Sequence, residues 1–147
     1  MTSEHRAHVD GLRVLLDGLT SPIHEVLASG DLVYPYVVLG GFRFEDRGES
    51  LAETDRVISE PLRVTYAAET VDGVLNVRSL VRAALRGASP AVEGWSTELT
   101  LVDSMDVDAD PTVTIPESSA NPFYAVDIFQ YDATAVPSAS LPPEEPS

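Results

Sequence analysis

The sequence predicts an α+β fold, with a mixed, mostly antiparallel sheet of about four strands, two helices packed on one sheet face and a long hairpin arm. Leu62, Val64 and Tyr66 alternate with polar residues, which is the pattern of a half-buried strand. The apolar residues that follow recur every three or four positions, as on one face of a helix: Val74, Val77, Val81 and Leu85. The order of the expected elements, helix–strand–strand–helix–strand–strand, favours helices on one side of a sheet.

The first helix is expected over residues 2–18. Its apolar face carries Val9, Leu12, Leu16 and Leu19. Ser3 is the expected N-cap and Gly18 the expected stop. His5 and His8 are spaced to share a helical face, but no carboxylate motif completes a metal site beside them. We therefore expect both histidines at a solvated helix end.

The next segments lead from this helix to a long polar loop. Residues 23–27 are expected to form a short turn or helix, and the β-branched and aromatic run 34–40 is expected to form a strand. The charged segment 41–55 then lies between two expected strands, and loops of this length are uncommon without a function. A hairpin with a flexible tip and an arm that orders on a partner both fit it, and the sequence leaves both open.

The strand and helix in the middle of the chain follow each other directly. The strand is expected over 56–66, and Val71-Asp72-Gly73 is interpreted as a break before the helix. The helix begins at Val74 in this interpretation. A polar stripe with a spacing of four runs along it: Arg78, Arg82 and Arg86.

The last part of the patterned chain predicts two further strands and a tail. A third strand is expected over 95–105, with Trp95 as a core or edge anchor. A twisted, interrupted strand is expected to contain Val107, Val113 and Ile115. The final strand, 123–131, is apolar on both faces, which suits a central strand or one covered at an interface. The sequence therefore divides into a domain over 1–132 and a disordered tail over 133–147, rich in Pro, Ser and Glu.

The charge and composition narrow the classes of partner. There are 24 acidic residues against 9 basic ones, all of them Arg, for a formal charge of −15. Because a phosphate backbone would repel such a surface, we expect no general nucleic-acid binding, and proteins or cations as partners. No stretch has the length and apolarity of a membrane span, and the N-terminal residues lack the layout of a signal peptide. We therefore expect the protein in the cytoplasm of the cell that makes it.

No residue pattern indicates an active site, a cofactor or a metal centre. The absence of Cys and Lys removes thiolate, Schiff-base and P-loop chemistry. Asp106, Asp108, Asp110 and Glu117 copy the carboxylate spacing of an EF-hand calcium loop. The copy fails because Pro111 stands where that loop needs Gly, and because the flanking segments are predicted strands instead of helices. We expect no cofactor, no metal site and no enzymatic activity.

Several segments together resemble the tail terminator proteins of long-tailed bacteriophages, the family of the lambda tail terminator, and in particular those of actinobacterial phages. The resemblance spans roughly residues 5–132 and rests on structural motifs. These motifs are the strand Pro35–Leu39 after an N-terminal helix, the long polar hairpin before Glu60–Tyr66, the helix with Val77, Val81, Arg82 and Leu85, and the ending Asn121–Tyr131.

The resemblance implies a structural virion protein that forms a ring, usually a hexamer. Such a ring caps the phage tail tube, ends tube polymerisation and provides the docking surface for the head connector. The implied partners are other copies of the chain, the major tail tube protein and the head-closure or connector protein, at the tail–neck junction of a virion assembled in the host cytoplasm. The expected interface residues lie in the arm and the last strand: Phe42, Phe44, Asp46, Arg47, Glu49, Glu53, Arg56, Phe129 and Tyr131.

Three alternatives from other classes stay open at this point. The first is a head-closure or head–tail connector ring protein of the phage neck, which has the same size, charge and partners. The second is a small acidic adaptor that binds one basic protein and stays monomeric. The third is a hydrolase with an unrecognised site.

Overall fold

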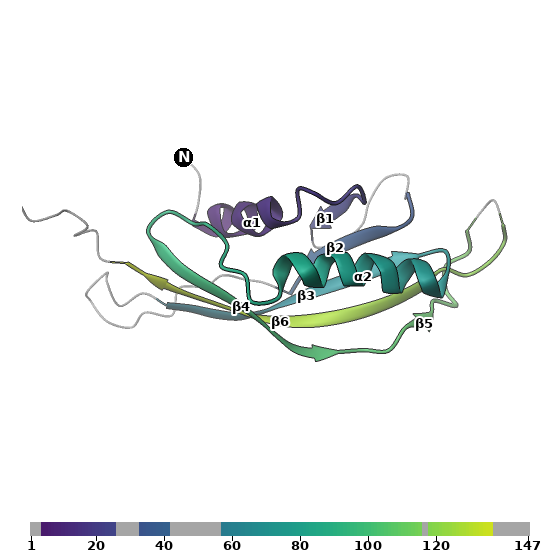
Figure 1. Ribbon diagram of the computed structural model, residues 1–147. Helices are drawn as coiled ribbons and strands as arrows, with labels where there is room; N and C mark the ends of the chain where they lie inside the picture. Colours follow the sequence, from purple (N-terminus) through teal and green to yellow (C-terminus); the bar gives the residue numbers. More distant parts are fainter. Residues whose placement is uncertain (1–3, 26–32, 42–56, 116–117, 137–147) are drawn as a thin grey trace, which may run out of the picture.

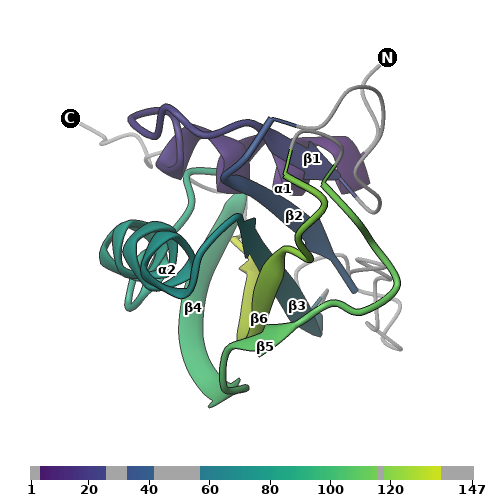
Figure 2. The same ribbon diagram turned by 90° about the vertical axis from the view of Figure 1, so that its right-hand side faces the viewer.

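Two helices lie on one face of an open, six-stranded, mostly antiparallel sheet (Figures 1 and 2). The computed structural model describes residues 4–25, 33–41, 57–115 and 118–136. Its helices are α1 (Glu4–Leu15) and α2 (Val71–Leu85). Its strands are β1 (Ile23–Glu25), β2 (Tyr36–Gly40), β3 (Val57–Ala68), β4 (Trp95–Ser104), β5 (Asp108–Ala109) and β6 (Phe123–Ala135). The expected α+β class is confirmed, with six strands where about four were expected.

The strand order is β1-β2-β3-β6-β4, with β5 paired to the first residues of β6. Only β1 and β2 run parallel, and the other pairs are antiparallel. β6 pairs with β3 on one side and with β4 and β5 on the other, so of the two alternatives for the last strand the central position is confirmed. This strand continues to Ala135, so residues 133–135 belong to the sheet instead of the expected tail.

β1 corrects the expectation for residues 23–27. Ile23–Glu25 forms a strand, not a turn or helix, because it pairs in parallel with Val37–Leu39. The amide of Val37 also donates to the carbonyl of Pro22. The twisted strand expected around Val107, Val113 and Ile115 is reduced to the two residues of β5.

The core lies between the helices and the sheet. Alternate residues of β3 and β6 point into it, and the apolar faces of both helices cover them. All apolar residues expected on the buried face of α2 are at most 2% exposed, which confirms that face: Val74, Val77, Val81 and Leu85. Trp95 packs against the edge of this core, as expected of an anchor.

The start of α2 corrects the interpretation of Val71-Asp72-Gly73 as a break. These residues form the first turn of the helix, and the Thr70 side chain caps it by accepting the Gly73 amide at 3.0 Å. A Cβ atom at Gly73 would lie 2.9 Å from the Cβ of Ala68, at the end of β3. Glycine therefore lets the helix begin directly against the strand that precedes it.

His8 is a second correction, because it lies in the core and not at a solvated helix end. Its side chain is 0% exposed, and Nδ1 lies 2.5 Å from the hydroxyl of Tyr131. The ring also meets Trp95 edge to face, with centroids 4.9 Å apart. α1 is thereby fixed to the central strand and to the start of β4.

Candidate interface

A buried ionic cluster fixes α2 to the sheet. Asp127 of β6 is 0% exposed and accepts from Arg82 Nε and Nη2, both at 2.8 Å, and from the Tyr66 hydroxyl at 2.7 Å. Burial of the carboxyl opposes its ionisation, but hydrogen bonds from Arg82, Tyr66 and Ser104 outweigh burial and hold the pKa of Asp127 below its ordinary value. Burial, and then the Asp127 carboxylate, raise the pKa of Tyr66. Arg82 is therefore structural, because it ties α2 to the central strand.

The outer flank of α2 forms the first candidate surface, which we call the α2 arginine surface. A shallow groove on it is lined by Leu75, Arg78, Ser79, Arg82, Ala83 and Arg86. Arg78 Nη1 donates to the carbonyl of Met105 at 3.2 Å, which brings the end of β4 to the same surface. Leu75 and Met105 are 41% and 44% exposed. Arg and Met are enriched in protein–protein interfaces relative to the rest of a protein surface.

The second candidate surface is the sheet face opposite the helices, which we call the open sheet face. No helix in the described part of the chain covers it (Figure 1). The register aligns Val38, Thr65 and Val126 across β2, β3 and β6, and Tyr36, Ala67 and Tyr124 in the next row. One end of this face is therefore apolar and aromatic.

The other end of the open sheet face is acidic. Glu98 of β4 stands directly opposite Asp132 of β6. The same two residues line a shallow groove with Gly87, Ser89, Ser96, Thr97 and Thr134. Asp132 accepts from the neutral donors Ser59, at 2.7 Å, and Gln130, at 3.3 Å, and no salt bridge between described residues includes either carboxylate. Like charges directly opposite each other destabilise a strand pair, so this end favours a cationic partner.

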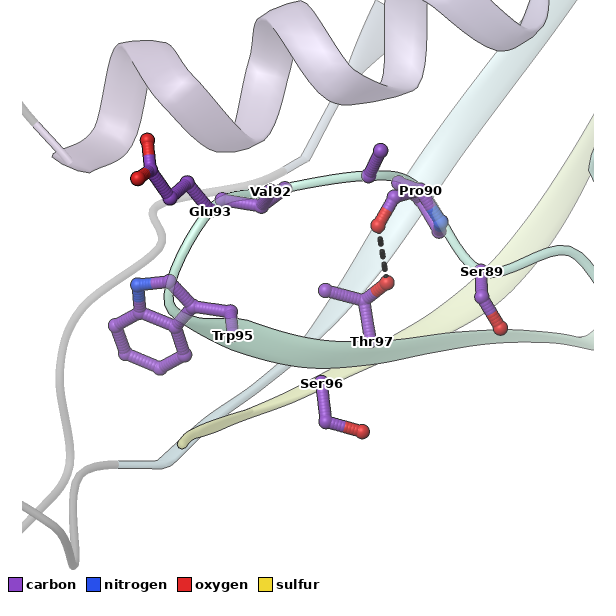
Figure 3. Close-up of a pocket in the computed structure, with 8 residues that line it drawn as sticks. Ser89, Pro90, Val92, Glu93, Trp95, Ser96 and Thr97 are labelled. Carbon is purple, nitrogen blue, oxygen red and sulfur yellow. Dashed lines mark hydrogen bonds between the residues drawn. The ribbon is translucent and has the colours of Figure 1, made fainter. Parts of the chain in front are cut away.

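A hollow at the start of β4 is lined by hydroxyls and apolar groups (Figure 3). The segment before β4 forms one wall of it, and the Thr97 hydroxyl donates to the Pro90 carbonyl across it. Glu93 is the sole titratable side chain among the described lining residues. The arrangement lacks a base beside a hydroxyl, so it does not form an activated nucleophile.

The expected interface residues are divided between the core and the part of the chain outside the described residues. Phe129 and Tyr131 are 0% and 1% exposed, because their face of β6 meets the helices. Neither is available at the surface, and the exposed face of β6 carries Tyr124, Val126 and Ile128 instead. The others lie outside the described residues: Phe42, Phe44, Asp46, Arg47, Glu49, Glu53 and Arg56.

The aspartate-rich segment lies at the edge of the sheet. Asp108 belongs to β5 and is paired with Tyr124 of β6, and Asp110 accepts from the amide and hydroxyl of Thr112. Glu117 lies outside the described residues. Within the described ranges, no three His, Cys, Asp or Glu side chains form a group that could hold a metal ion. Neither described helix has the length and apolarity to span a bilayer.

The fold is similar to that of a chain in a solved virion. That structure is the virion of a native gene transfer agent (GTA) particle, and the alignment covers 84% of this chain and 84% of that chain, with a TM-score of 0.58 and 14% sequence identity. No protein-family model matches the sequence, and no curated protein matches it. At this identity the comparison establishes a shared fold.

Proposed function

We propose that this chain is a structural virion protein of a phage-like particle. The observation that carries the proposal is the fold shared with a GTA virion chain over 84% of both chains. The two candidate surfaces, on opposite sides of the sheet, support it, because a subunit of an assembly needs more than one contact surface. The work of the protein in this proposal is association and not catalysis.

The finer proposal is a tail terminator. Copies of the chain form a ring, a hexamer by resemblance, which caps the tail tube, ends its polymerisation and offers the head connector a docking surface. The segment 42–55, with its charged and aromatic residues, orders against a neighbouring copy or against the tube. The strong negative charge suits this role, since charge steers encounter and selects register between ring proteins.

Negative-stain electron microscopy of the purified protein, alone and mixed with tail tubes, tests the proposal. Rings at one end of the tubes are the expected result. Rings that do not bind tubes but bind head connectors would indicate a neck connector protein instead of a tail terminator. A protein that stays monomeric and leaves the tubes uncapped would refute the ring and favour the adaptor.

Deletion of residues 47–54 tests the role of the arm separately. We expect the shortened chain to fold and to fail in capping, so that tail tubes grow beyond their normal length. A deletion variant that still gives tails of fixed length would show that the arm is dispensable. Circular dichroism of the variant separates a lost contact from a lost fold.

A further inference from the structure

The geometry points to the occupant of the α2 arginine surface: the acidic end of the open sheet face of a second copy of this chain. The inference rests on the proposed ring, and it names the two surfaces through which neighbouring copies meet. It starts from an imbalance, because three arginines gather on one helix flank of a chain whose formal charge is −15.

Not all of the arginines on this flank form an ion pair with a described carboxylate of the same chain. Arg82 is bound to Asp127 and Ser104, whereas the hydrogen bond that Arg78 makes within the described residues goes to a backbone carbonyl. Arg86 is exposed and forms no salt bridge with a described carboxylate. Two guanidinium groups beside Leu75 and Met105 are thus available to a partner that is acidic and partly apolar.

The complementary surface exists on the same chain, in the groove along β4. Glu98 and Asp132 face each other without a described cation, in a groove lined otherwise by Gly, Ser and Thr. A guanidinium inserted between them would relieve their repulsion and bind both carboxylates. Apart from the two carboxylates the groove is lined by small residues, so an arginine from a neighbouring helix can reach the carboxylates.

The positions of the two surfaces determine the symmetry of the contact. A two-fold dimer through the α2 arginine surface would bring arginines against arginines, and one through the acidic groove would bring carboxylates against carboxylates. A contact of the arginine surface of one copy with the acidic groove of another joins opposite charges. Because this contact joins two different surfaces, a copy that uses one of each with its two neighbours propagates the contact, and the series closes into a ring if its rotation allows.

Reciprocal charge reversal tests the contact by sedimentation velocity of the full chain over a range of concentrations. The arginine-surface variant, Arg78→Glu/Arg86→Glu, makes that surface acidic. The groove variant, Glu98→Arg/Asp132→Arg, makes the groove basic. We expect each variant alone to associate at least about tenfold more weakly than the original chain. An equimolar mixture of the two restores association, because each variant then meets a neighbour of opposite charge at both of its surfaces.

Matched controls carry the same change of charge elsewhere. Arg63→Glu alters an exposed arginine in the middle of the open sheet face that lines neither groove, and Asp17→Arg alters an exposed carboxylate beyond α1. We expect neither to weaken association by more than about twofold. If Asp132→Arg disturbs β6, the neutral variant Glu98→Gln/Asp132→Asn replaces it, and it weakens association without supporting complementation.

The outcomes separate this inference from the proposed function. Variants that associate like the original chain, or a mixture that stays dissociated, overturn the inference. If the arginine-surface variant still forms rings but no longer binds tubes, the α2 arginine surface binds a different protein, and the inference is again overturned. Rings that cap tubes in all of these cases leave the proposed function standing, whereas an original chain that neither assembles nor caps tubes refutes both.

Discussion

Replacing Arg82 by Met should destabilise the domain by about 3 kcal/mol. The change keeps most of the aliphatic stem of the side chain and removes two charge-assisted hydrogen bonds to Asp127, each 2.8 Å long. Removing one partner of a buried ion pair costs about 3–5 kcal/mol, because the other charge stays buried. The Arg82 side chain is 28% exposed, so water can enter its place, and we take the lower end of that range. The midpoint of thermal unfolding should fall by about 6–12 °C.

The assay is denaturant unfolding followed by the fluorescence of Trp95, the only tryptophan. Arg86→Met is the control, since it removes an arginine of the same stripe that binds no described carboxylate, and it should change the free energy of unfolding by less than about 0.5 kcal/mol. If the free energy of unfolding of Arg82→Met lies within about 1 kcal/mol of that of the unaltered chain, which is the size of one surface ion pair, Asp127 does not depend on Arg82.

The pH dependence of the same variant carries the sign of the interaction. In the unaltered chain the pKa of Asp127 is lowered, so its ionised form contributes stability above the ordinary carboxyl pKa of 3.8, and this contribution is lost as the pH falls through the lowered value. Without Arg82 the carboxylate keeps its hydrogen bonds from Tyr66 and Ser104 but loses its cation, so burial favours the neutral form and protonation removes the penalty of the buried charge. The stability difference between the two chains should therefore be full at neutral pH and shrink as the medium becomes acidic. A difference that does not change with pH would refute the electrostatic explanation.

Three further predictions concern the N-cap of α2 and the contacts that fix α1 to the sheet. Thr70→Ala should cost about 1 kcal/mol by removing the N-cap of α2, and Thr70→Ser should restore most of it, both measured by thermal unfolding. Hydrogen bonds from two arginines of α1 lower the pKa of Glu25 from 4.5 to about 2. The ionised Glu25 should therefore contribute about 2 kcal/mol to the free energy of unfolding after solvent screening, in full above pH 4.5 and progressively less toward pH 2. A Glu25→Gln variant whose stability falls with acid as much as that of the unaltered chain would contradict this. Tyr131→Phe should cost about 1–2 kcal/mol through the lost contact with His8, whereas Tyr124→Phe on the open sheet face should be near neutral; equal effects of the two would contradict the burial assigned to them.

The parts of the fold that followed from the sequence are those in which local pattern and burial agree. The apolar spacing of α2 and the alternation in β3 each mark one buried face, and both faces are buried as expected. β1 could not be found in this way, because a strand of three residues exists only through its pairing with β2. Residues 71–73 were misread because Asp-Gly signals a turn, while the capping hydroxyl of Thr70 lies one residue before the segment.

The candidate interface was harder to derive, because β6 is apolar on both faces. Periodicity alone does not say which face meets the helices. Phe129 and Tyr131 are expected at an interface, but their face of β6 is the buried one. A signal was available in Asp127, which shares their face: a carboxylate within a central strand requires a cation, and the arginines of α2 are spaced to supply it. His8 carried no such signal, because its partner Tyr131 is 123 positions away.

The place of β6 in the sheet has a consequence for biosynthesis. Among the described elements β6 is translated last, yet it is the strand that joins β3 to β4. Until it emerges, those two strands each present an unpaired edge, and their helices have no complete sheet to cover. Pairs that join residues as distant as Val57 and Thr134 form slowly, since a long loop must close first. Nascent chains should thus depend on the ribosome or on chaperones to keep β3 and β4 apart from their counterparts on neighbouring polysomes until the central strand arrives.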